Sequence, residues 1–300
     1  MTYKKFKEAL FHALEDFYGD DAEIQFTDVV KLNDQHLDGI NITHKDNDRP
    51  INPVMYANGF YEKYTEGQMT MEDIVGQIID TMEHNEIAPE IYDMTKLLSD
   101  WNTASEYIYP LLVHTDSNGE MLEKLVSTPF LDLSVIYYIK LGSLQNGETN
   151  VKITHQLFNS FGITMDELHE QALANLRNND CLEVNSMADV LQRLLPDSVT
   201  RGIDVPEPCN MHVMSNRSKM FGAAHLLDME NMPIPYSGKS FYVIPSSIHE
   251  AILIDDDSIE PRMINDMIHD VNGSVLSPED ILSTHCYYYD GSQRQLRMCA

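Results

Sequence analysis

The sequence is poor in positive charge. Its 300 residues include 48 Asp and Glu but only 20 Lys and Arg, which gives a formal net charge of −28. Nucleic acids and anionic membranes bind proteins largely through Lys and Arg, so this balance argues against direct binding to either. A surface this acidic is expected to attract a basic protein partner. The alternative is that the charge serves only to keep the chain in solution.

Cysteines and long apolar runs are also scarce. The 4 cysteines are scattered and none forms a C-x-x-C pair, which is typical neither of a disulfide framework nor of a zinc clasp. No run approaches the roughly 18 apolar residues of a membrane span. Glu and His interrupt the stretch near the N-terminus that would have to be the apolar core of a signal peptide. We therefore expect a cytoplasmic protein.

The common catalytic and nucleotide-binding motifs are absent. A zinc hydrolase motif H-E-x-x-H would need a second histidine after His169 or His249, but Leu173 and Leu253 stand there. Neither G-x-S-x-G nor a glycine-rich phosphate loop occurs. The sequence therefore predicts no metal and no cofactor. It leaves open whether the chain is an enzyme, and leans against it.

What is present is a mixture of helix and strand patterns. Apolar residues at helical spacing predict helices over residues 2–18, 70–82, 165–179, 187–195 and 263–271. Alternating or continuous apolar runs predict a hairpin over 23–44 and strands over 107–114, 131–142, 241–244, 250–254 and 285–291. Because strands and helices come in mixed order, we predict an α+β fold with a mixed or antiparallel sheet flanked by helices.

Local signals refine this prediction. Helix starts are indicated by Thr70 with Asp73, Thr164 with Glu167 and Ser186 with Asp189. Asn33-Asp34 and Asn272-Gly273 predict turns, and the tail 292–300 is expected to fray. A boundary near residue 100 would divide the chain into an N-terminal α+β region, 1–100, and a C-terminal α+β region, 101–300.

One stretch, "FYVIPSSIHEAILIDDD" over residues 241–257, concentrates reactive side chains. Ser246, Ser247, His249 and Glu250 are the candidate catalytic residues, although a triad is assembled in space and not by adjacency in sequence. The favoured interpretation is a corner between two strands, at which the serines bind backbone groups. The three aspartates at its end lack the spacing of a calcium loop and indicate a solvated strand end.

Acidic residues gather in two segments that hold almost no basic residues. Only Lys96 opposes the acids between Glu66 and Glu123, and only Arg262 opposes those between Glu250 and Asp290. Such segments are typical of acidic faces. The candidate partner-binding residues are Glu72, Asp73, Asp80, Glu83, Glu86, Glu90, Asp255, Asp256 and Asp257.

Three functions remain open at this point. The first is a binding or regulatory protein that docks on a basic partner. One form of it is a nucleic-acid mimic that inhibits a nucleic-acid-binding enzyme. The second is an enzyme of unrecognised type that uses the corner at residues 246–250. The third is a structural domain whose charge only keeps it soluble. The sequence gives no oligomeric state.

Several stretches carry a family resemblance. "SNRSKMFGAAHLL", "FYVIPSSIHEAILI" and "MINDMIHDVNGSVLSPEDILSTHCYYYDG" resemble an uncharacterised bacterial family, domain of unknown function 5688. The likeness covers nearly the whole chain, which implies one inherited architecture. It implies no activity, so no residue takes a role from it.

Overall fold

The chain forms two compact units, Met1–Lys96 (unit 1) and Leu97–Ala300 (unit 2). The division predicted after residue 100 lies close to this boundary. The computed structural model describes residues 1–45, 54–84, 100–144, 147–194, 210–233, 235–255 and 259–299. None of the helices in these ranges is long and apolar enough to cross a membrane.

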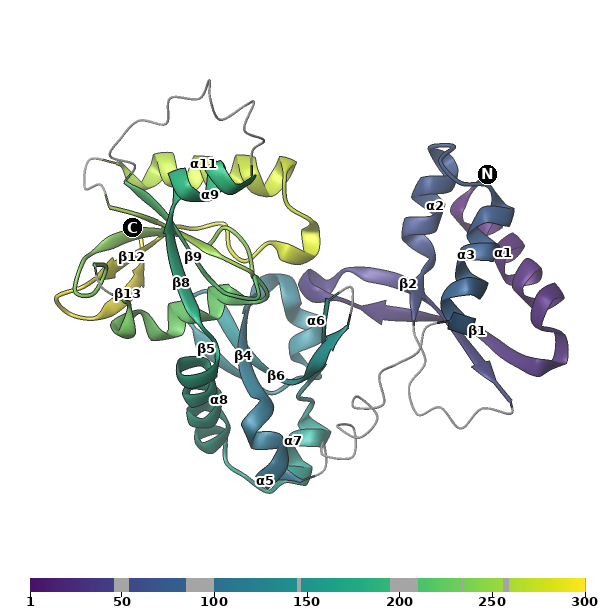
Figure 1. Ribbon diagram of the computed structural model, residues 1–300, viewed down its shortest axis with the longest axis horizontal. Helices are drawn as coiled ribbons and strands as arrows, with labels where there is room; N and C mark the ends of the chain where they lie inside the picture. The colour runs from purple at the N-terminus through teal and green to yellow at the C-terminus, as the bar shows by residue number, and fades with distance from the viewer. Residues whose placement is uncertain are drawn as a thin grey trace. The chain divides into compact units, whose positions relative to one another are not determined.

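Unit 1 is a small antiparallel sheet covered by three helices (Figure 1). Its elements are α1 (Tyr3–Tyr18), β1 (Ala22–Val30), β2 (His36–His44), β3 (Met55–Tyr56), α2 (Ala57–Thr65) and α3 (Met71–His84). The strands follow the order β1-β2-β3, and the predicted hairpin of β1 and β2 is confirmed. Ile24 pairs with Ile42 and Phe26 with Ile40, which places these apolar side chains on one face of the sheet.

The helices of unit 1 bury their apolar stripes against that face. Phe6, Leu10 and Leu14 of α1 are buried, as their spacing predicts. The same apolar spacing predicts that Phe17 also faces the core, but Phe17 is 58% exposed and Tyr18 is buried in its place. In α3, Ile74 and Ile78 join the same core. The prediction about Phe17 was wrong because the last turn of α1 presents the adjacent residue to the sheet.

Unit 2 contains two antiparallel sheets. The first has four strands, β4 (Ile108–His114), β5 (Ser127–Phe130), β6 (Leu133–Leu144) and β7 (Gly147–Lys152). As predicted from its long apolar run, β6 is central and pairs with each of the others. The helix α8 (Met165–Asn179) packs on β4, and its buried Asn175 Nδ2 donates to the Ile108 carbonyl at 2.8 Å. Short helices α5 (Trp101–Ala104), α6 (Gly119–Leu122) and α7 (His155–Phe161) lie around this sheet (Figure 1).

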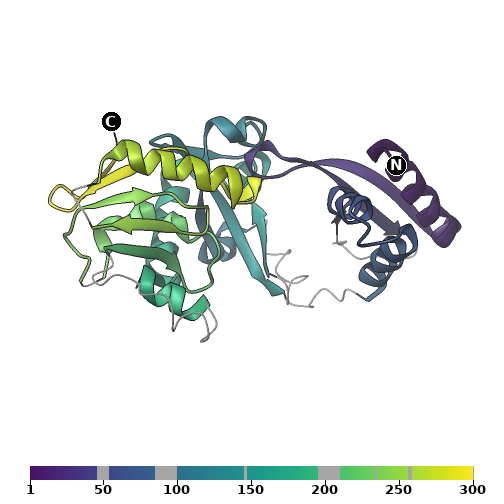
Figure 2. The ribbon, with the colours of Figure 1, turned by 90° about the horizontal axis from the view of Figure 1, so that it is seen from above.

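The second sheet has six strands in the order β13-β12-β10-β11-β9-β8. They are β8 (Leu182–Ser186), β9 (Met211–Asn216), β10 (Phe241–Ile244), β11 (Ala251–Ile254), β12 (Tyr287–Asp290) and β13 (Gln295–Met298). Helices α9 (Met187–Leu194) and α11 (Pro261–Ser274) lie next to this sheet (Figures 1 and 2). A ten-residue 3₁₀ segment, η6 (Gly222–Asn231), packs against β9.

Two local predictions in this region were wrong. Asn272-Gly273 lies inside α11 and makes no turn between elements. Residues Gln295–Met298 of the tail form β13 because they pair with β12, whose outer edge would otherwise be open. Three antiparallel sheets with helices packed against them make the fold α+β, as predicted.

A carboxylate joins the two sheets of unit 2. Asp132 precedes β6, and its two oxygens accept hydrogen bonds from Tyr287 Oη at 2.7 Å and Ser283 Oγ at 2.8 Å. Tyr287 is fully buried on β12. This contact fastens the last strands of the chain to the first sheet of the unit.

Candidate functional site

The serine-histidine stretch is a closed corner between β10 and β11. Ser247 N donates to the Glu250 carbonyl at 3.1 Å, and Ser247 Oγ accepts from His249 N at 3.1 Å. The serine hydroxyl therefore stabilises the turn through a backbone group, as the corner interpretation predicts.

The His249 ring is also engaged within the fold. Its Nδ1 accepts from Phe221 N at 3.1 Å, and its Nε2 lies 3.3 Å from Asp280 Oδ1. A ring that accepts at Nδ1 is the neutral tautomer with its proton on Nε2. The ring also stacks on Phe221, with centroids 5.7 Å apart. Both ring nitrogens of His249 are therefore engaged with Phe221 and Asp280, and neither contacts a serine hydroxyl through these bonds. Catalysis by the corner stays a prediction that this geometry does not support.

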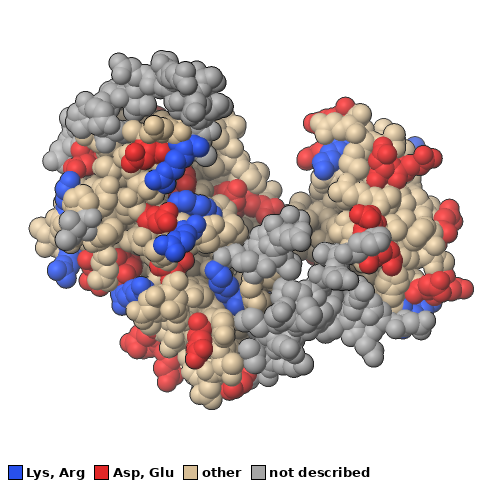
Figure 3. Space-filling view, in the orientation of Figure 1, with Lys and Arg blue, Asp and Glu red and all other residues tan. Residues whose placement is uncertain are grey.

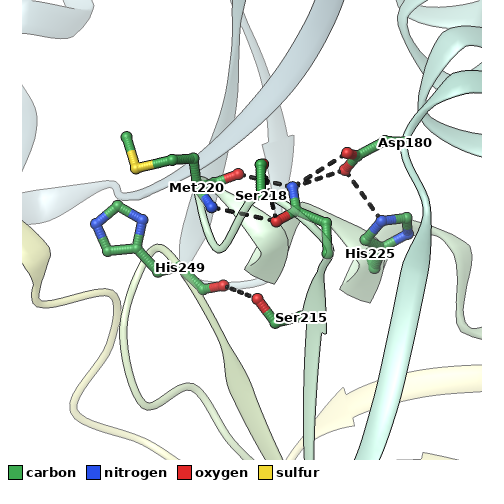
Figure 4. Close-up of polar contacts among 7 residues, drawn as sticks. Asp180, Ser215, Ser218, Met220, His225 and His249 are labelled. Carbon is green, nitrogen blue, oxygen red and sulfur yellow. Dashed lines mark hydrogen bonds and ion pairs between the residues drawn. The ribbon is translucent and has the colours of Figure 1, made fainter. Parts of the chain in front are cut away.

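A second polar group gathers around Asn216, at the end of β9 (Figure 4). Asn216 is buried, and its Nδ2 donates to Asp180 Oδ2 at 2.9 Å and to the Met220 carbonyl at 2.7 Å. Its Oδ1 accepts from Ser218 Oγ at 3.2 Å and from Met220 N at 3.1 Å. One amide thus satisfies both sides of a turn and a carboxylate at the end of α8.

The turn itself depends on a glycine. Phe221 adopts a left-handed conformation, with φ of 58°, and the following Gly222 lies against β9 and the corner at His249. A Cβ on Gly222 would lie 2.6 Å from Asn216 N, the His249 carbonyl oxygen and Ser215 Oγ. Only glycine fits there without displacing backbone. The turn leads into η6, which carries His225 and packs against α8.

These residues border a polar cavity of about 520 Å³, called the α8 cavity below. Its lining residues are Arg177, Asn178, Asn179, Asp180, Cys181, Leu182, His225, Asp228 and Asn231. His225, 3% exposed, lies with Nε2 at 3.1 Å from Asp180 Oδ2. Arg177 Nε donates to Asp228 Oδ1 at 2.6 Å. A concave site with converging polar groups and buried charges is the arrangement expected of a ligand pocket.

The sequence did not single out this cavity. Asp180 and His225 are 45 residues apart and belong to no known motif. The available signal was the stretch "SNRSKMFGAAHLL", which supplies the buried amide, the glycine and the histidine in one run. Within the described ranges no group of three or more His, Cys, Asp or Glu side chains is placed to hold a metal ion.

Comparison with known families matches residues 3–291 to the model described as "Family of unknown function (DUF5688)". The chain belongs to this family. The matched residues of this DUF5688 protein span both units. They include the sheet of unit 1 and, up to residue 291, the two sheets of unit 2. No curated protein matches the chain. No solved structure matches it either.

The two acidic segments of this DUF5688 protein fall in different places. Glu72, Asp73, Asp80 and Glu83 are all exposed on α3 of unit 1. Asp255 ends β11 of unit 2, where Lys239 Nζ lies 3.1 Å from its carboxylate. Glu86, Glu90, Asp256 and Asp257 lie outside the described residues. The structure therefore brings four of the candidates together on one helix.

Two of the α3 carboxylates have local partners. Asp73 accepts from Thr70 N at 2.9 Å and Thr70 Oγ1 at 2.7 Å, and these hydrogen bonds lower the pKa of Asp73 below its ordinary value. Glu83 lies 3.3 Å from His44 Nε2. Thr70 and Asp73 thus form the capping pair at the start of α3, as predicted.

An open groove of about 440 Å³ runs between α2 and α3. Its lining includes Met55, Tyr56, Phe60, Lys63, Gln77 and Thr81. It combines apolar and aromatic side chains with a few polar ones, which is typical of a surface that binds another chain. We call it the α2/α3 groove.

Proposed function

We propose that this protein is a binding protein whose unit 1 docks on a basic segment of a partner protein through the α2/α3 groove. The observation that carries the proposal is the charge of the groove's rims. Residues three or four positions apart are neighbours on a helix surface. On α3, Asp73 and Asp80 therefore flank the lining residue Gln77, and both are exposed.

The other wall has the same character. On the α2 side, Glu62 lies three positions from the lining residue Gly59, and Glu66 lies three positions from Lys63. Both glutamates are exposed. The visible face over α2 and α3 carries several acidic groups (Figure 3). Lys63 is the one basic residue that lines the groove within the described ranges.

The groove and its rims suit a basic amphipathic helix. Apolar side chains of such a helix would enter between α2 and α3, where Phe60 is nearly buried and Val54 is 39% exposed. Its Lys or Arg side chains would reach the acidic rims, which steer association and fix register. Exposed charges contribute more to the rate and salt dependence of binding than to final affinity, so the apolar centre is needed for stable docking.

A defined probe tests this proposal. A synthetic helix with leucines on one face and lysines on the other should bind the full chain at low salt and dissociate as salt screens the rims. Glu62→Lys with Asp80→Lys should weaken binding about tenfold or more, since two attractions become repulsions. Fluorescence anisotropy measures the affinity, and backbone NMR shifts should map to α2 and α3.

The matched control is Glu23→Lys with Glu170→Lys, which changes the net charge equally at exposed residues that do not line the groove. That variant should bind within about twofold of the parent, because screening limits distant charges. Equal losses in both variants would reduce the effect to overall charge and contradict the proposal. A salt-graded pull-down from cell lysate, read by mass spectrometry with both variants, would then identify the natural partner.

Nucleic-acid mimicry is the finer form of this proposal and stays a prediction. It would require the rim carboxylates to occupy the phosphate-binding site of a nucleic-acid-binding protein. Competition by duplex DNA for the same partner would test it: a partner that binds DNA and this chain at once excludes mimicry.

A further inference from the structure

We propose that the α8 cavity binds a small organic cation through an ammonium or guanidinium group. This inference concerns unit 2 and is independent of the α2/α3 groove of unit 1. It rests on three features of the cavity: hydrogen-bond acceptors that the fold leaves unused, an excess of carboxylates, and a volume that suits a small ligand.

The first unused acceptor is on His225. Asp180 accepts from its Nε2, so in the neutral ring the lone pair is on Nδ1. No side chain or backbone group in the described part of the chain bonds to that Nδ1. The ring is 3% exposed and lines the cavity, and it lies next to Asp180 (Figure 4), which also accepts a hydrogen bond from Asn216 Nδ2.

The second unused acceptor is on Asp228. Its side chain is 7% exposed. Oδ1 accepts from Arg177 Nε at 2.6 Å and from Asn231 Nδ2 at 2.8 Å, whereas Oδ2 receives no hydrogen bond from the described residues. A buried carboxylate is stable only when its oxygens have donors. A ligand that donates to Oδ2 would therefore complete the site.

The charge of the walls selects a cation. Asp180 and Asp228 line the cavity, and Arg177 is the one basic side chain among its lining residues in the described ranges. Arg177 is shared with an acid beside the cavity, since its Nη2 lies 3.6 Å from Glu230 Oε1. An anion would meet two carboxylates, and a neutral polyol would leave the excess charge uncompensated. An ammonium or guanidinium group meets both needs, because it carries positive charge and only donates hydrogen bonds.

The volume of about 520 Å³ lies within the range of small-molecule sites. Cys181 lines the same cavity and is exposed, so its thiol can report occupancy. Agmatine, which has a guanidinium at one end and an ammonium at the other, is a suitable probe. Glucose and inorganic phosphate serve as the neutral and anionic comparisons.

The experiment is calorimetric titration of the full chain with each probe, together with the rate of Cys181 alkylation by iodoacetamide, followed by peptide mass spectrometry. We expect agmatine to bind with one site per chain and to slow Cys181 alkylation, while glucose and phosphate do neither. Asp228→Asn should weaken agmatine binding about tenfold, as for a charge-assisted hydrogen bond. Glu230→Gln should keep binding within about twofold, since Glu230 contacts Arg177 but does not line the cavity.

Comparing Asp228→Asn with Glu230→Gln separates an effect at the cavity from an effect of the chain's overall acidity. Each substitution removes one negative charge and one partner of Arg177. Equal losses in the two variants would overturn the proposal, as would agmatine that neither binds the wild type nor protects Cys181. Phosphate or glucose binding as tightly as agmatine would overturn the assignment to a cation. A capped Ala-Arg-Ala peptide that binds as well as agmatine would overturn the assignment to a free small molecule. The wild-type titrations decide the question even if Asp228→Asn does not fold.

Discussion

The two units bury different kinds of side chain. Every buried polar or charged residue in the described part of the chain lies in unit 2, among them Asn175, Asn216, His225 and Asp228. The core of unit 1 is an apolar cluster built from α1, α2, α3 and the sheet. Apolar burial is non-directional, whereas each buried polar group needs a particular partner. Unit 1 is therefore specified by the periodicity of its elements, and unit 2 by particular hydrogen bonds as well.

Cutting the apolar core should have the largest effect, and it should be confined to unit 1. Ile78 is 0% exposed, so Ile78→Ala should destabilise unit 1 by about 2–5 kcal/mol through lost burial and a new cavity. Hydrogen exchange in urea, read by mass spectrometry, should show lost protection in peptides from unit 1 only. The control Phe17→Ala, at a side chain 58% exposed, should change stability by less than about 1 kcal/mol. Equal loss of protection in unit 2 would show that the units do not unfold separately.

Removing the central amide should show how far unit 2 depends on its polar network. Asn216→Ala removes one of the two donors to Asp180 and leaves Met220 N and the Met220 carbonyl without their side-chain partner, and we expect a cost of about 2–3 kcal/mol. Asn41 of unit 1 is the matched amide: it is half-buried, and its one side-chain hydrogen bond among the described residues runs from Nδ2 to Thr27 Oγ1. Asn41→Ala should cost about 0.5–1 kcal/mol. Urea unfolding measures both, and equal costs would remove the distinction between the units.

Two buried tyrosines give the smallest and finest test. Tyr137 of unit 2 bonds through Oη to Thr128 Oγ1 at 2.7 Å and His169 Nδ1 at 2.8 Å. Tyr18 of unit 1 has a buried hydroxyl that makes no hydrogen bond of good geometry in the described part of the chain, and burial and the nearby Glu83 carboxylate raise its pKa to about 12. Tyr137→Phe should cost about 1 kcal/mol, and Tyr18→Phe should be neutral or slightly stabilising.

The stability of the protein at alkaline pH gives a second test of Tyr137. Burial raises the pKa of Tyr137 from 10.0 to about 12. Because the pKa is higher in the folded state, Tyr137 loses its proton more readily in the unfolded chain. The stability that Tyr137 contributes is therefore fully present below pH 10.0 and is lost as the pH rises through about 12. The melting temperature of Tyr137→Phe should therefore fall less steeply over this pH interval than the melting temperature of the wild type. An unchanged slope would contradict the assignment.

The sequence predicts the elements of both units where one period or one cap determines them. The burial of Phe6, Leu10 and Leu14 in α1, the β1–β2 hairpin and the Thr164–Glu167 capping box of α8 are as expected, and the hydrogen bonds from Thr164 lower the pKa of Glu167. The central position of β6 followed from its long apolar run. These features are local, so a single sequence contains the information that fixes them.

The α8 cavity could not be predicted in the same way. Its members include the end of α8 and η6, a 3₁₀ segment whose position depends on the approach of Gly222 to β9 and to the corner between β10 and β11. No periodicity reports such an approach. The strand β13 was missed for a related reason, because three of its four residues are exposed and its pairing with β12 comes only from the assembled sheet.

The bond between Asp132 and Tyr287 has a consequence for synthesis of the chain on the ribosome. The two residues are 155 positions apart, and β12, which carries Tyr287, is the inner neighbour of β10. Unit 1 can complete its sheet once its own residues have emerged, while translation of the rest continues. Unit 2 must wait with β10 unpaired on one side and Asp132 without its donors until residues 287–290 leave the exit tunnel. During that interval β10, which lies between β12 and β11 in the finished sheet, exposes an edge on which a chaperone could act.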